Sequence, residues 1–284
     1  MRKLLERSVA SVDERLVLLA PPETTVPDSF LNVTVDPLRH QQLVAEIQRL
    51  RGRVYLADGA VKPEYLSPEG LHCTPEDERS WHLVMLDQDR EVSSCAWYME
   101  HDVTAQFEQL RVRTCPLTCV EGWRERLWHA VEAELQRART EQLRYAEVGG
   151  WAVAKRSRCT SEGLVLALAA YSLGRALGGA LGITTATVRH SSSTILRRLG
   201  GRLLEFDGST IPPYYDPRYE CQMELLRFDS RRPHVKYNGL IELLRRKLAG
   251  VSVIASPPRA AASEPLTSVT SFTTASVSQP AYAV

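Results

Sequence analysis

The spacing of apolar residues along this chain changes several times between helical and strand-like. Over residues 37–51 and 121–139, apolar residues recur every three or four positions with charged residues between them, which predicts two amphipathic helices. A long apolar stretch over 161–181 predicts a helix buried in the core. Shorter helices are predicted over 191–199 and 240–248.

Strands are predicted where apolar and β-branched residues run together between turn residues. A polar turn at 87–90 joins two of these runs into a hairpin, and later the chain alternates strand, helix and strand. This order predicts an α+β domain with a mixed α/β sheet. The predicted strands are 54–56, 82–86, 92–99, 110–115, 145–154, 183–188, 203–206 and 220–228.

Composition divides the chain into four parts. Residues 1–30 are predicted to be a variable lead-in that ends among prolines, and 31–228 the main domain. Residues 229–255 read as a basic helical extension. From 256 to 284 the chain is mostly Ser, Thr, Ala, Pro and Val, which bury too little apolar surface to offset the entropy of ordering, so a disordered tail is predicted.

The overall composition is that of a globular protein with balanced charge. The 284 residues are 44% hydrophobic, which excludes disorder of the whole chain. Lys and Arg number 35 against 34 Asp and Glu, for a net charge of +1. A dedicated nucleic-acid-binding protein usually carries a basic excess, so no nucleic-acid partner is expected.

The cysteines and the N-terminus favour a cytoplasmic protein. The six cysteines include no CxxC pair, so we expect reduced thiols and no metal site. Glu6, Asp13 and Glu14 interrupt the apolar residues of the N-terminus, which argues against a secretion signal. Arg175 and four glycines interrupt the apolar stretch at 164–183, which favours a buried helix over a membrane span.

Residues 146–163 carry the most informative pattern, in which a strand, a basic loop and the start of an apolar helix follow one another. The first turn of a helix has unpaired N–H groups and the positive end of the helix dipole, and therefore attracts phosphate. The contributing residues would be the basic Lys155, Arg156 and Arg158, the capping Thr160 or Ser161, and Gly163, which leaves room for phosphate at the backbone.

This loop resembles the phosphate loop of the GNAT acyltransferase superfamily, which reads Gln/Arg-x-x-Gly-x-Gly/Ala. Arg158-Cys159-Thr160-Ser161-Glu162-Gly163 matches it, with Ser161 in place of the first glycine. The resemblance spans residues 36–228 and implies a GNAT-like fold with a central, mostly antiparallel, twisted sheet flanked by helices. It also implies that the loop, Glu162 included, binds the pyrophosphate and pantetheine of an acyl donor, either acyl-coenzyme A or acyl-acyl carrier protein.

A second resemblance is narrower. The segment 147–153, EVGGWAV, is similar to the Glu-x-Ser-Arg-(aromatic)-x-Val strand of acyl-homoserine-lactone synthases and to the corresponding strand of long-chain N-acyl amino acid synthases. Gly150 stands where that strand has arginine, which favours the N-acyl amino acid branch or an uncharacterised relative. The segment 187–201 looks like their continuation but lacks the tyrosine acid of acetyl-transferring relatives.

These patterns predict an N-acyltransferase that moves an acyl group from a thioester to an amine, with amino acids among the candidates. Glu147 is the candidate general base, and His190 is the alternative. His190, Ser192 or Ser193 would replace the missing tyrosine acid, unless the thiolate leaves without an acid.

Two further features concern the donor. Main-chain N–H groups from Val153 to Lys155 would stabilise the oxyanion if a bulge at 149–150 splayed this strand from its neighbour. Trp97, Tyr98 and Trp151 either line an acyl groove or belong to the plain core.

Other classes of protein stay open at this point. Loss of the family arginine and tyrosine suits a non-catalytic module that binds acyl donors or acts as a scaffold. A third class is a membrane-surface protein that uses the basic helix at 239–249 for peripheral contact. Arg197, Arg198 and Arg202 either face an acidic acyl carrier protein or form a solvated helix face.

Overall fold

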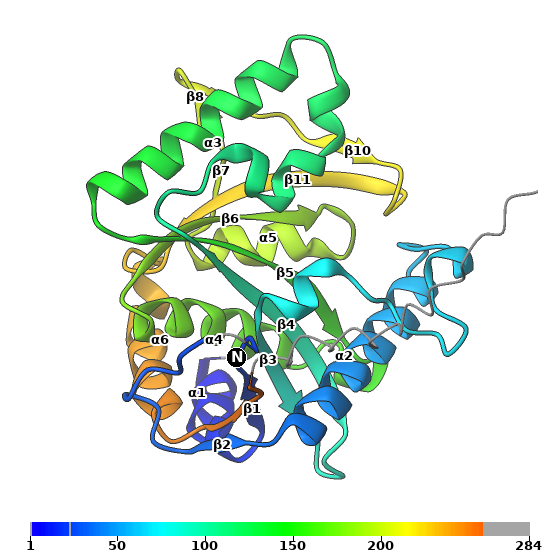
Figure 1. Ribbon diagram of the computed structural model, residues 1–284, viewed down its shortest axis with the longest axis vertical. Coiled ribbons are helices and arrows are strands. Elements are labelled where there is room, and N and C mark those ends of the chain that lie inside the picture. Colours follow the sequence, from blue (N-terminus) through cyan, green and yellow to red (C-terminus); the bar gives the residue numbers. More distant parts are fainter. Residues whose placement is uncertain (1, 23, 258–284) are drawn as a thin grey trace, which may run out of the picture.

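The computed structural model describes residues 2–22 and 24–257, so most of the predicted tail at 256–284 lies outside the described residues (Figure 1). The helices are α1 (Arg2–Ala10), α2 (Pro37–Ala57), α3 (Trp123–Thr140), α4 (Glu162–Ala176), α5 (Ser192–Leu199) and α6 (Val235–Leu248). The strands are β1 (Leu16–Leu19), β2 (Val33–Val35), β3 (Trp81–Leu86), β4 (Val92–His101), β5 (Arg144–Val153), β6 (Ala180–Thr187), β7 (Arg202–Leu203), β8 (Glu205–Phe206), β9 (Ser209–Thr210), β10 (Tyr214–Asp216), β11 (Cys221–Asp229) and β12 (Ser252–Ala255).

Ten of these strands form one sheet, in the order β10-β11-β6-β5-β4-β3-β1-β12-β2 with β7 beside β11. Most neighbours are antiparallel, and the parallel pairs in the described chain are β5–β6, β1–β12 and β12–β2. The predicted fold class is confirmed: the protein is α+β, with a mostly antiparallel central sheet flanked by helices.

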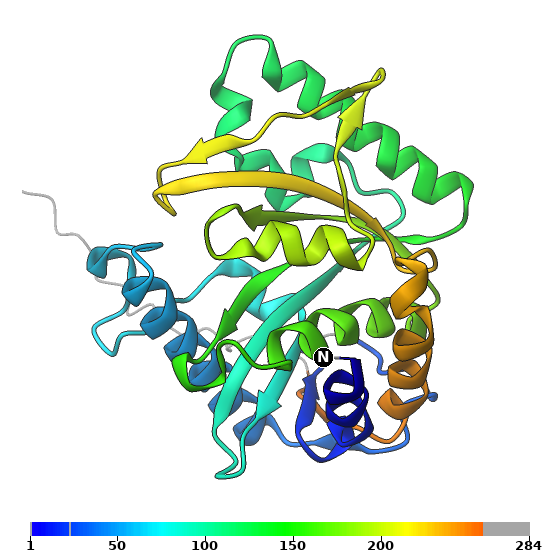
Figure 2. The same ribbon diagram turned by 180° about the vertical axis from the view of Figure 1, so that it is seen from behind.

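Helices cover both faces of the sheet. The face toward the viewer in Figure 1 carries α3 over β5, β6 and β11, and α2 over β1, β3 and β4, whereas α1, α4, α5 and α6 lie on the face seen in Figure 2. Successive side chains of a strand point to opposite faces. In β1, Leu16 and Leu18 accordingly pack with α1, α4 and α6, while Val17 and Leu19 pack against α2.

The sheet takes in both ends of the described chain. β1 pairs antiparallel with β3 and parallel with β12, and β12 also pairs with β2. Segments 1–30 and 229–255, which the sequence analysis placed outside the main domain, therefore supply strands to its sheet. Their four-residue strands are too short to show a period, and β1 is buried at every position and so shows no alternation.

Two of the predicted strands are wrong. Residues 54–56 form the end of α2, because the buried stripe of Leu43, Ile47 and Leu50 continues to Val54 at helical spacing. Residues 110–115 form a turn of 3₁₀ helix (Arg111–Thr114), whose main-chain N–H groups bond to a buried carboxylate described below.

The basic helix predicted at 239–249 corresponds to the C-terminal part of α6, whose apolar side packs on α4. Ile241, Leu244 and Leu248 are fully buried there, while Arg245 pairs with Glu242 on the exposed side. Because membrane binding by a helix needs an exposed apolar side, this packing does not support the predicted membrane contact. Over the described ranges, the helices lack the combined length and apolarity that crossing a bilayer requires.

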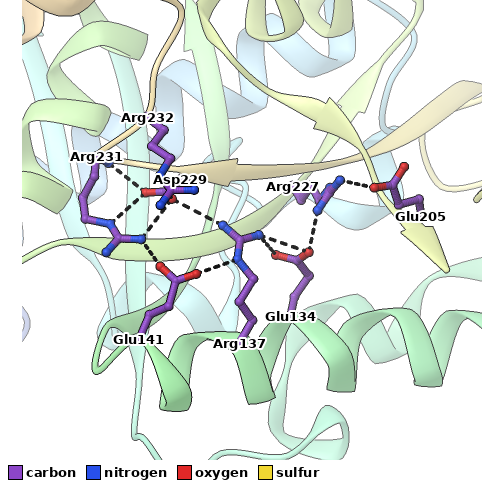
Figure 3. Close-up of polar contacts among 8 residues, drawn as sticks. All are labelled: Glu134, Arg137, Glu141, Glu205, Arg227, Asp229, Arg231 and Arg232. Carbon is purple, nitrogen blue, oxygen red and sulfur yellow. Dashed lines mark hydrogen bonds and ion pairs between the residues drawn. The ribbon is translucent and has the colours of Figure 1, made fainter. Parts of the chain in front are cut away.

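A network of charged side chains ties α3 to β11 (Figure 3). Glu134, whose side chain is only 8% exposed, accepts hydrogen bonds from Arg137 Nη1 at 3.1 Å and Arg227 Nη1 at 2.9 Å. Arg137 Nη2 also lies 3.3 Å from Asp229 Oδ2. The network extends toward solvent through Glu141, Glu205, Arg231 and Arg232.

Glu134→Ala should lower the free energy of unfolding by about 3 kcal/mol, because it leaves two arginines without their shared partner in a largely buried site. The matched control is Arg232→Ala, whose side chain is 74% exposed and which should change stability by less than about 1 kcal/mol. Urea unfolding of both variants measures the two effects. Equal losses in the two variants would contradict this ranking.

Candidate active site

The centre of the candidate site is the place where β5 and β6 separate. Their parallel pairing begins at Arg144 with Ala180 and ends at Val148 with Thr184. Both strands continue past this point, β5 to Val153 and β6 to Thr187. The facing edges of the two strands therefore form no ladder with each other over these last residues.

A bulge in β5 accompanies the separation. Trp97 pairs with Gly149 whereas Cys95 pairs with Ala152, so β5 has one extra residue opposite β4. Gly150 has a φ of +62°, in the left-handed region that favours glycine. The Trp97 ring lies against this turn so closely that a Cβ at Gly149 or Gly150 would overlap it. The bulge and the splay anticipated from the Gly-Gly pair are both present.

A cavity of about 680 Å³ passes through the opening between the strands. This volume is within the usual range of small-molecule sites. Because its walls include α4 and α5 on one face of the sheet and α2 on the other, the cavity crosses the sheet. Side chains at its apolar end include Leu164, Ala167, Tyr171, Leu196 and Phe228. Side chains at its polar end include Arg51, Tyr55, His72, Thr74 and Arg111.

The first turn of α4 borders the cavity. The N–H of Glu162 donates to Thr160 Oγ1 at 3.1 Å, and the N–H groups of Gly163 and Leu164 make no hydrogen bond to the described part of the chain. A Cβ at Gly163 would lie 3.3 Å from Cζ2 of Trp151, so glycine leaves room for that ring. Free N–H groups and the helix dipole make this edge of the cavity attractive to phosphate.

The basic residues before α4 point in different directions. Arg158 lines the cavity and forms a two-pronged ion pair with Asp58 at the end of α2, with Nη1–Oδ1 2.9 Å and Nη2–Oδ2 2.7 Å. Arg156 instead pairs with Asp87 in the β3–β4 turn. Lys155 is exposed, and neither Lys155 nor Arg156 lines the cavity.

Two other predicted donor-binding residues face α1 and β4 rather than the cavity. Ser161 Oγ lies 2.7 Å from Ser8 Oγ. The buried Glu162 carboxylate accepts hydrogen bonds from Arg15 Nη2 at 2.6 Å and Ser93 Oγ at 2.6 Å. These contacts fix the start of α4 relative to its neighbours.

Thr160 and Val153, two further predicted donor-binding residues, line the cavity. Among the main-chain donors expected from 153 to 155, the N–H of Ala154 donates to the Ser93 carbonyl at 2.8 Å and is not free. The main-chain groups that border the opening are therefore those of residues 149–153 in β5, which face Thr185 to Thr187 of β6 without pairing with them.

Glu147 lies beside the cavity and lines a small adjoining hollow that shares Trp97 and Arg111 with it. Its Oε2 accepts the main-chain N–H of Arg111 at 2.7 Å and contacts His101 Nε2 at 3.0 Å, and its Oε1 accepts the N–H of Val112 at 2.9 Å. Glu147 does not line the cavity, but Arg111 does. The carboxylate thus holds the turn that carries Arg111, and it acts on the cavity by fixing the position of that residue.

The other predicted catalytic residues differ in their relation to the cavity. Ser193 is buried with its hydroxyl bonded to Glu224, and it is absent from the cavity walls formed by the described residues, although Ser191 and Ser192 line them. The side chain of His190 lies outside the described part of the chain. Trp97 and Trp151 line the cavity, whereas Tyr98 belongs to the core.

Sequence reasoning missed the polar end of the cavity. Arg51 is only 1% exposed, and its Nη2 donates to the His72 carbonyl at 2.8 Å and to Asp77 Oδ2 at 2.6 Å. In the sequence Arg51 falls between Leu50 and Val54 on the apolar stripe of α2. A charged residue is rarely buried without a partner, so its place on this stripe was the available signal.

The charges at the polar end are fixed near neutral pH. Burial, helped by the charge of Arg51, lowers the pKa of His72 to about 4, so this ring is neutral at pH 7. Burial opposes the charge of Arg51, but the hydrogen bond and charge of Asp77 outweigh it and raise its pKa. Burial also opposes the charge of Arg111, while Tyr219 and Glu76 raise its pKa overall. Two guanidinium cations therefore border this end.

The cysteines and acidic side chains of the described residues form neither disulfides nor a metal-binding cluster. All six cysteines are unpaired. Among the residues that the structure describes, no group of three or more His, Cys, Asp and Glu side chains is arranged to hold a metal ion.

The similarity to known proteins lies in structure. No protein-family model and no curated protein matches the chain. It is similar to FeeM, an N-acyl amino acid synthase from uncultured soil microbes (11% identity, 70% of this chain and 89% of that chain covered, TM-score 0.45). It is also similar to two coenzyme A-dependent acyl-homoserine lactone synthases, BjaI (15% identity, 86% and 94% covered, TM-score 0.49) and MesI (14% identity, 84% and 98% covered, TM-score 0.47). Both groups of synthases that the sequence resembles are thus represented among these structures.

Glu147→Gln should lower the free energy of unfolding by about 1–3 kcal/mol, because the amide NH₂ would face N–H groups that now donate to a carboxylate. A general base would instead cost about 10²–10⁴-fold in turnover with unchanged stability. Urea unfolding and steady-state rates at two pH values separate these outcomes, with the exposed Glu125→Gln as control.

Proposed function

We propose that this protein is an N-acyltransferase that moves an acyl group from a thioester donor to an amine. The observation that carries the proposal is the single cavity that crosses the sheet where β5 and β6 separate, apolar at its α4–α5 end and polar at its α2 end. This arrangement supports an acyl chain on one face of the sheet and a polar acceptor on the other. The thioester carbonyl would then lie at the opening, beside strand edges able to hydrogen-bond to the donor.

The reaction forms a C–N bond and breaks a C–S bond. An acceptor ammonium loses one proton to become the attacking amine, and the nitrogen loses a second proton as the tetrahedral intermediate collapses. The leaving thiolate takes up one of these protons, and the other passes to solvent. Because both substrates share one cavity, the protein contributes proximity and orientation to this step.

Glu147 is proposed as a positioning residue in this reaction. Both of its oxygens accept hydrogen bonds from the protein, and its contact with the cavity runs through Arg111. Ser193 is likewise occupied by Glu224. Both side chains are therefore occupied by other protein groups, whereas Ser192, another candidate acid, lines the cavity, so the thiolate would leave either directly or with a proton from Ser192.

The donor phosphate is proposed to bind at the first turn of α4. The free N–H groups of Gly163 and Leu164, the Thr160 side chain and the Arg158 guanidinium border the same part of the cavity. Arg158 pairs with Asp58 in this structure, so phosphate binding would exchange one anion for another on the same guanidinium.

The donor carrier is either coenzyme A or acyl carrier protein. An open groove of about 820 Å³ adjoins the cavity and shares Arg198 with it. Arg197, Arg202 and Lys236 also line this groove, so its charge favours an acidic carrier protein. Comparing one acyl chain on the two carriers distinguishes between them.

Arg158→Ala should weaken donor binding about tenfold or more, because it removes a charge-assisted phosphate contact. Asp58→Asn should strengthen donor binding, because it releases Arg158 while keeping a side chain of the same shape. Calorimetric titration with acyl-coenzyme A at low and moderate salt measures both. A change in the same direction for the two variants would contradict the proposed exchange.

Thiol release from acyl donors mixed with the twenty common amino acids and simple amines tests the function, with products identified by mass spectrometry. Ala167→Phe should narrow the apolar end, so turnover of a twelve-carbon donor should fall about tenfold or more while acetyl transfer persists. The exposed Ala133→Phe on α3 is the matched control and should leave both rates unchanged. Donor binding with no thiol release under any of these conditions would favour the non-catalytic donor-binding module instead.

A further inference from the structure

Three buried polar atoms at the polar end of the cavity have no hydrogen-bond partner among the described residues. They are Arg51 Nε, His72 Nδ1 and Thr74 Oγ1, and all three residues line the cavity. Buried polar groups are normally paired, and an unpaired one costs about 1–3 kcal/mol. Three such atoms in one corner point to a ligand that pairs with them.

This corner, formed by Arg51, His72 and Thr74, is held in place by Asp77. Asp77 Oδ2 accepts hydrogen bonds from Arg51 Nη2 at 2.6 Å and from the Thr74 main-chain N–H at 3.0 Å. The N–H of Asp77 donates to the Thr74 carbonyl at 3.0 Å and also faces the Thr74 hydroxyl in a capping box, so the hydroxyl oxygen has at most this weak contact and its proton has no acceptor. The His72 ring packs edge-on against Tyr55, with ring centroids 5.2 Å apart. The corner is therefore built before any ligand enters.

The chemistry of the corner selects an anion with oxygen acceptors. Arg51 uses Nη2 for its internal partners, whereas its buried Nε–H has no partner and can donate to another acceptor. The Thr74 hydroxyl adds a donor, and neutral His72 adds a hydrogen-bonding nitrogen without further charge. A planar guanidinium beside a hydroxyl matches the geometry of a carboxylate.

The corner also lies next to the opening between the strands. Arg51 Nη1 is 3.2 Å from the place that a Cβ of Gly150 would occupy, at the bulge that separates β5 from β6. A second cation, Arg111, lies over the Trp97 ring at 5.8 Å from its centroid and borders the same cavity. An acid group bound at Arg51 is thus close to the place proposed for the thioester carbonyl.

We propose that the Arg51–His72–Thr74 corner binds the carboxylate of the acceptor, so that the acceptor is an α-amino acid or another amine with a nearby carboxylate. This inference rests on the proposed acyl transfer. Holding the carboxylate in the corner orients the amine toward the strand opening, on the face of the sheet opposite the acyl chain.

The first test compares matched acceptors. The best amino acid from the thiol-release assay is compared with the amine that lacks only its carboxylate, for example phenylalanine with phenethylamine. A site built around hydrogen bonds to a group rejects analogues that lack it, so we expect kcat/KM at least about 100-fold higher for the amino acid. Equal use of the two acceptors would overturn this inference and leave the proposed acyl transfer standing.

The second test uses variants of the corner. Thr74→Val keeps the shape of the side chain and removes the hydroxyl, so it should cost only the weak capping contact in stability. KM for the amino acid should rise about tenfold with kcat and donor affinity preserved. Arg51→Gln should have a larger effect, and the double variant Arg51→Gln with Asp77→Asn keeps the comparison valid if the single variant unfolds. Arg53→Gln, exposed two residues further along α2, is the control that should change nothing. An unchanged KM in Thr74→Val would overturn the assignment.

Direct binding separates failure of this inference from failure of the proposed function. If no acceptor releases thiol, acyl transfer is wrong, and calorimetry with amino acids in the absence of donor still measures the corner. Binding that Thr74→Val weakens supports a carboxylate site, whereas no binding of any amino acid overturns it.

Discussion

The contact between the Trp97 ring and the Gly149–Gly150 turn is the constraint on which the rest of the site depends. A side chain at either glycine would overlap the ring, and the left-handed φ of Gly150 makes room for the extra residue of the bulge. The bulge follows directly after the last β5–β6 pair, Val148 with Thr184. Beyond this pair the two strands separate, where continued pairing would close the sheet. A cavity that crosses a sheet needs such an interruption, because continuous pairing would seal it.

The polar groups around this opening divide into two kinds. Glu147 and Glu162 are buried carboxylates whose two oxygens both accept hydrogen bonds from the protein. Asp77 accepts hydrogen bonds at Oδ2, and its Oδ1 is unpaired. All three carboxylates hold loops or helix ends in place. Arg51 Nε, His72 Nδ1 and Thr74 Oγ1 are buried and unpaired, and all of them border the cavity. Fully paired carboxylates rigidify a structure, whereas unpaired donors at a cavity wall mark the place where a ligand completes them.

The glycine at position 150 leaves space that a guanidinium from another element borders. The strands that 147–153 resembles carry an arginine at this position, and here the guanidinium of Arg51 from α2 lies beside the glycine instead. A residue with a Cβ at 150 would collide with Trp97 and crowd Arg51. The cation beside the bulge of this chain therefore comes from a helix on the α2 face of the sheet.

Elements with a clear local period could be predicted from the sequence. The helices α3, α4 and α5, the β3–β4 hairpin, β5 and β6 lie close to their predicted ranges, because amphipathic spacing and turn residues act within one element. The strand–loop–helix order at 146–163 and the need for glycines at the bulge could also be inferred, since both follow from neighbouring residues. Glu147 was predicted as a general base from the resemblance of the 147–153 strand to the synthases, which does not show what its carboxylate contacts.

Tertiary structure alone decided what these residues contact. Glu147 bonds to N–H groups 35 and 36 residues away in sequence, and Arg51 finds Asp77 26 residues away, so no local pattern reveals either pairing. The four-residue strands β1 and β12 become sheet strands only because each meets a partner across most of the chain. Local spacing fixes which face of an element is apolar, but long-range closure of the sheet fixes which charges are buried together. That closure is the reason why Glu147 is proposed to position Arg111 and why Arg51, a helix arginine, is part of the proposed acceptor site.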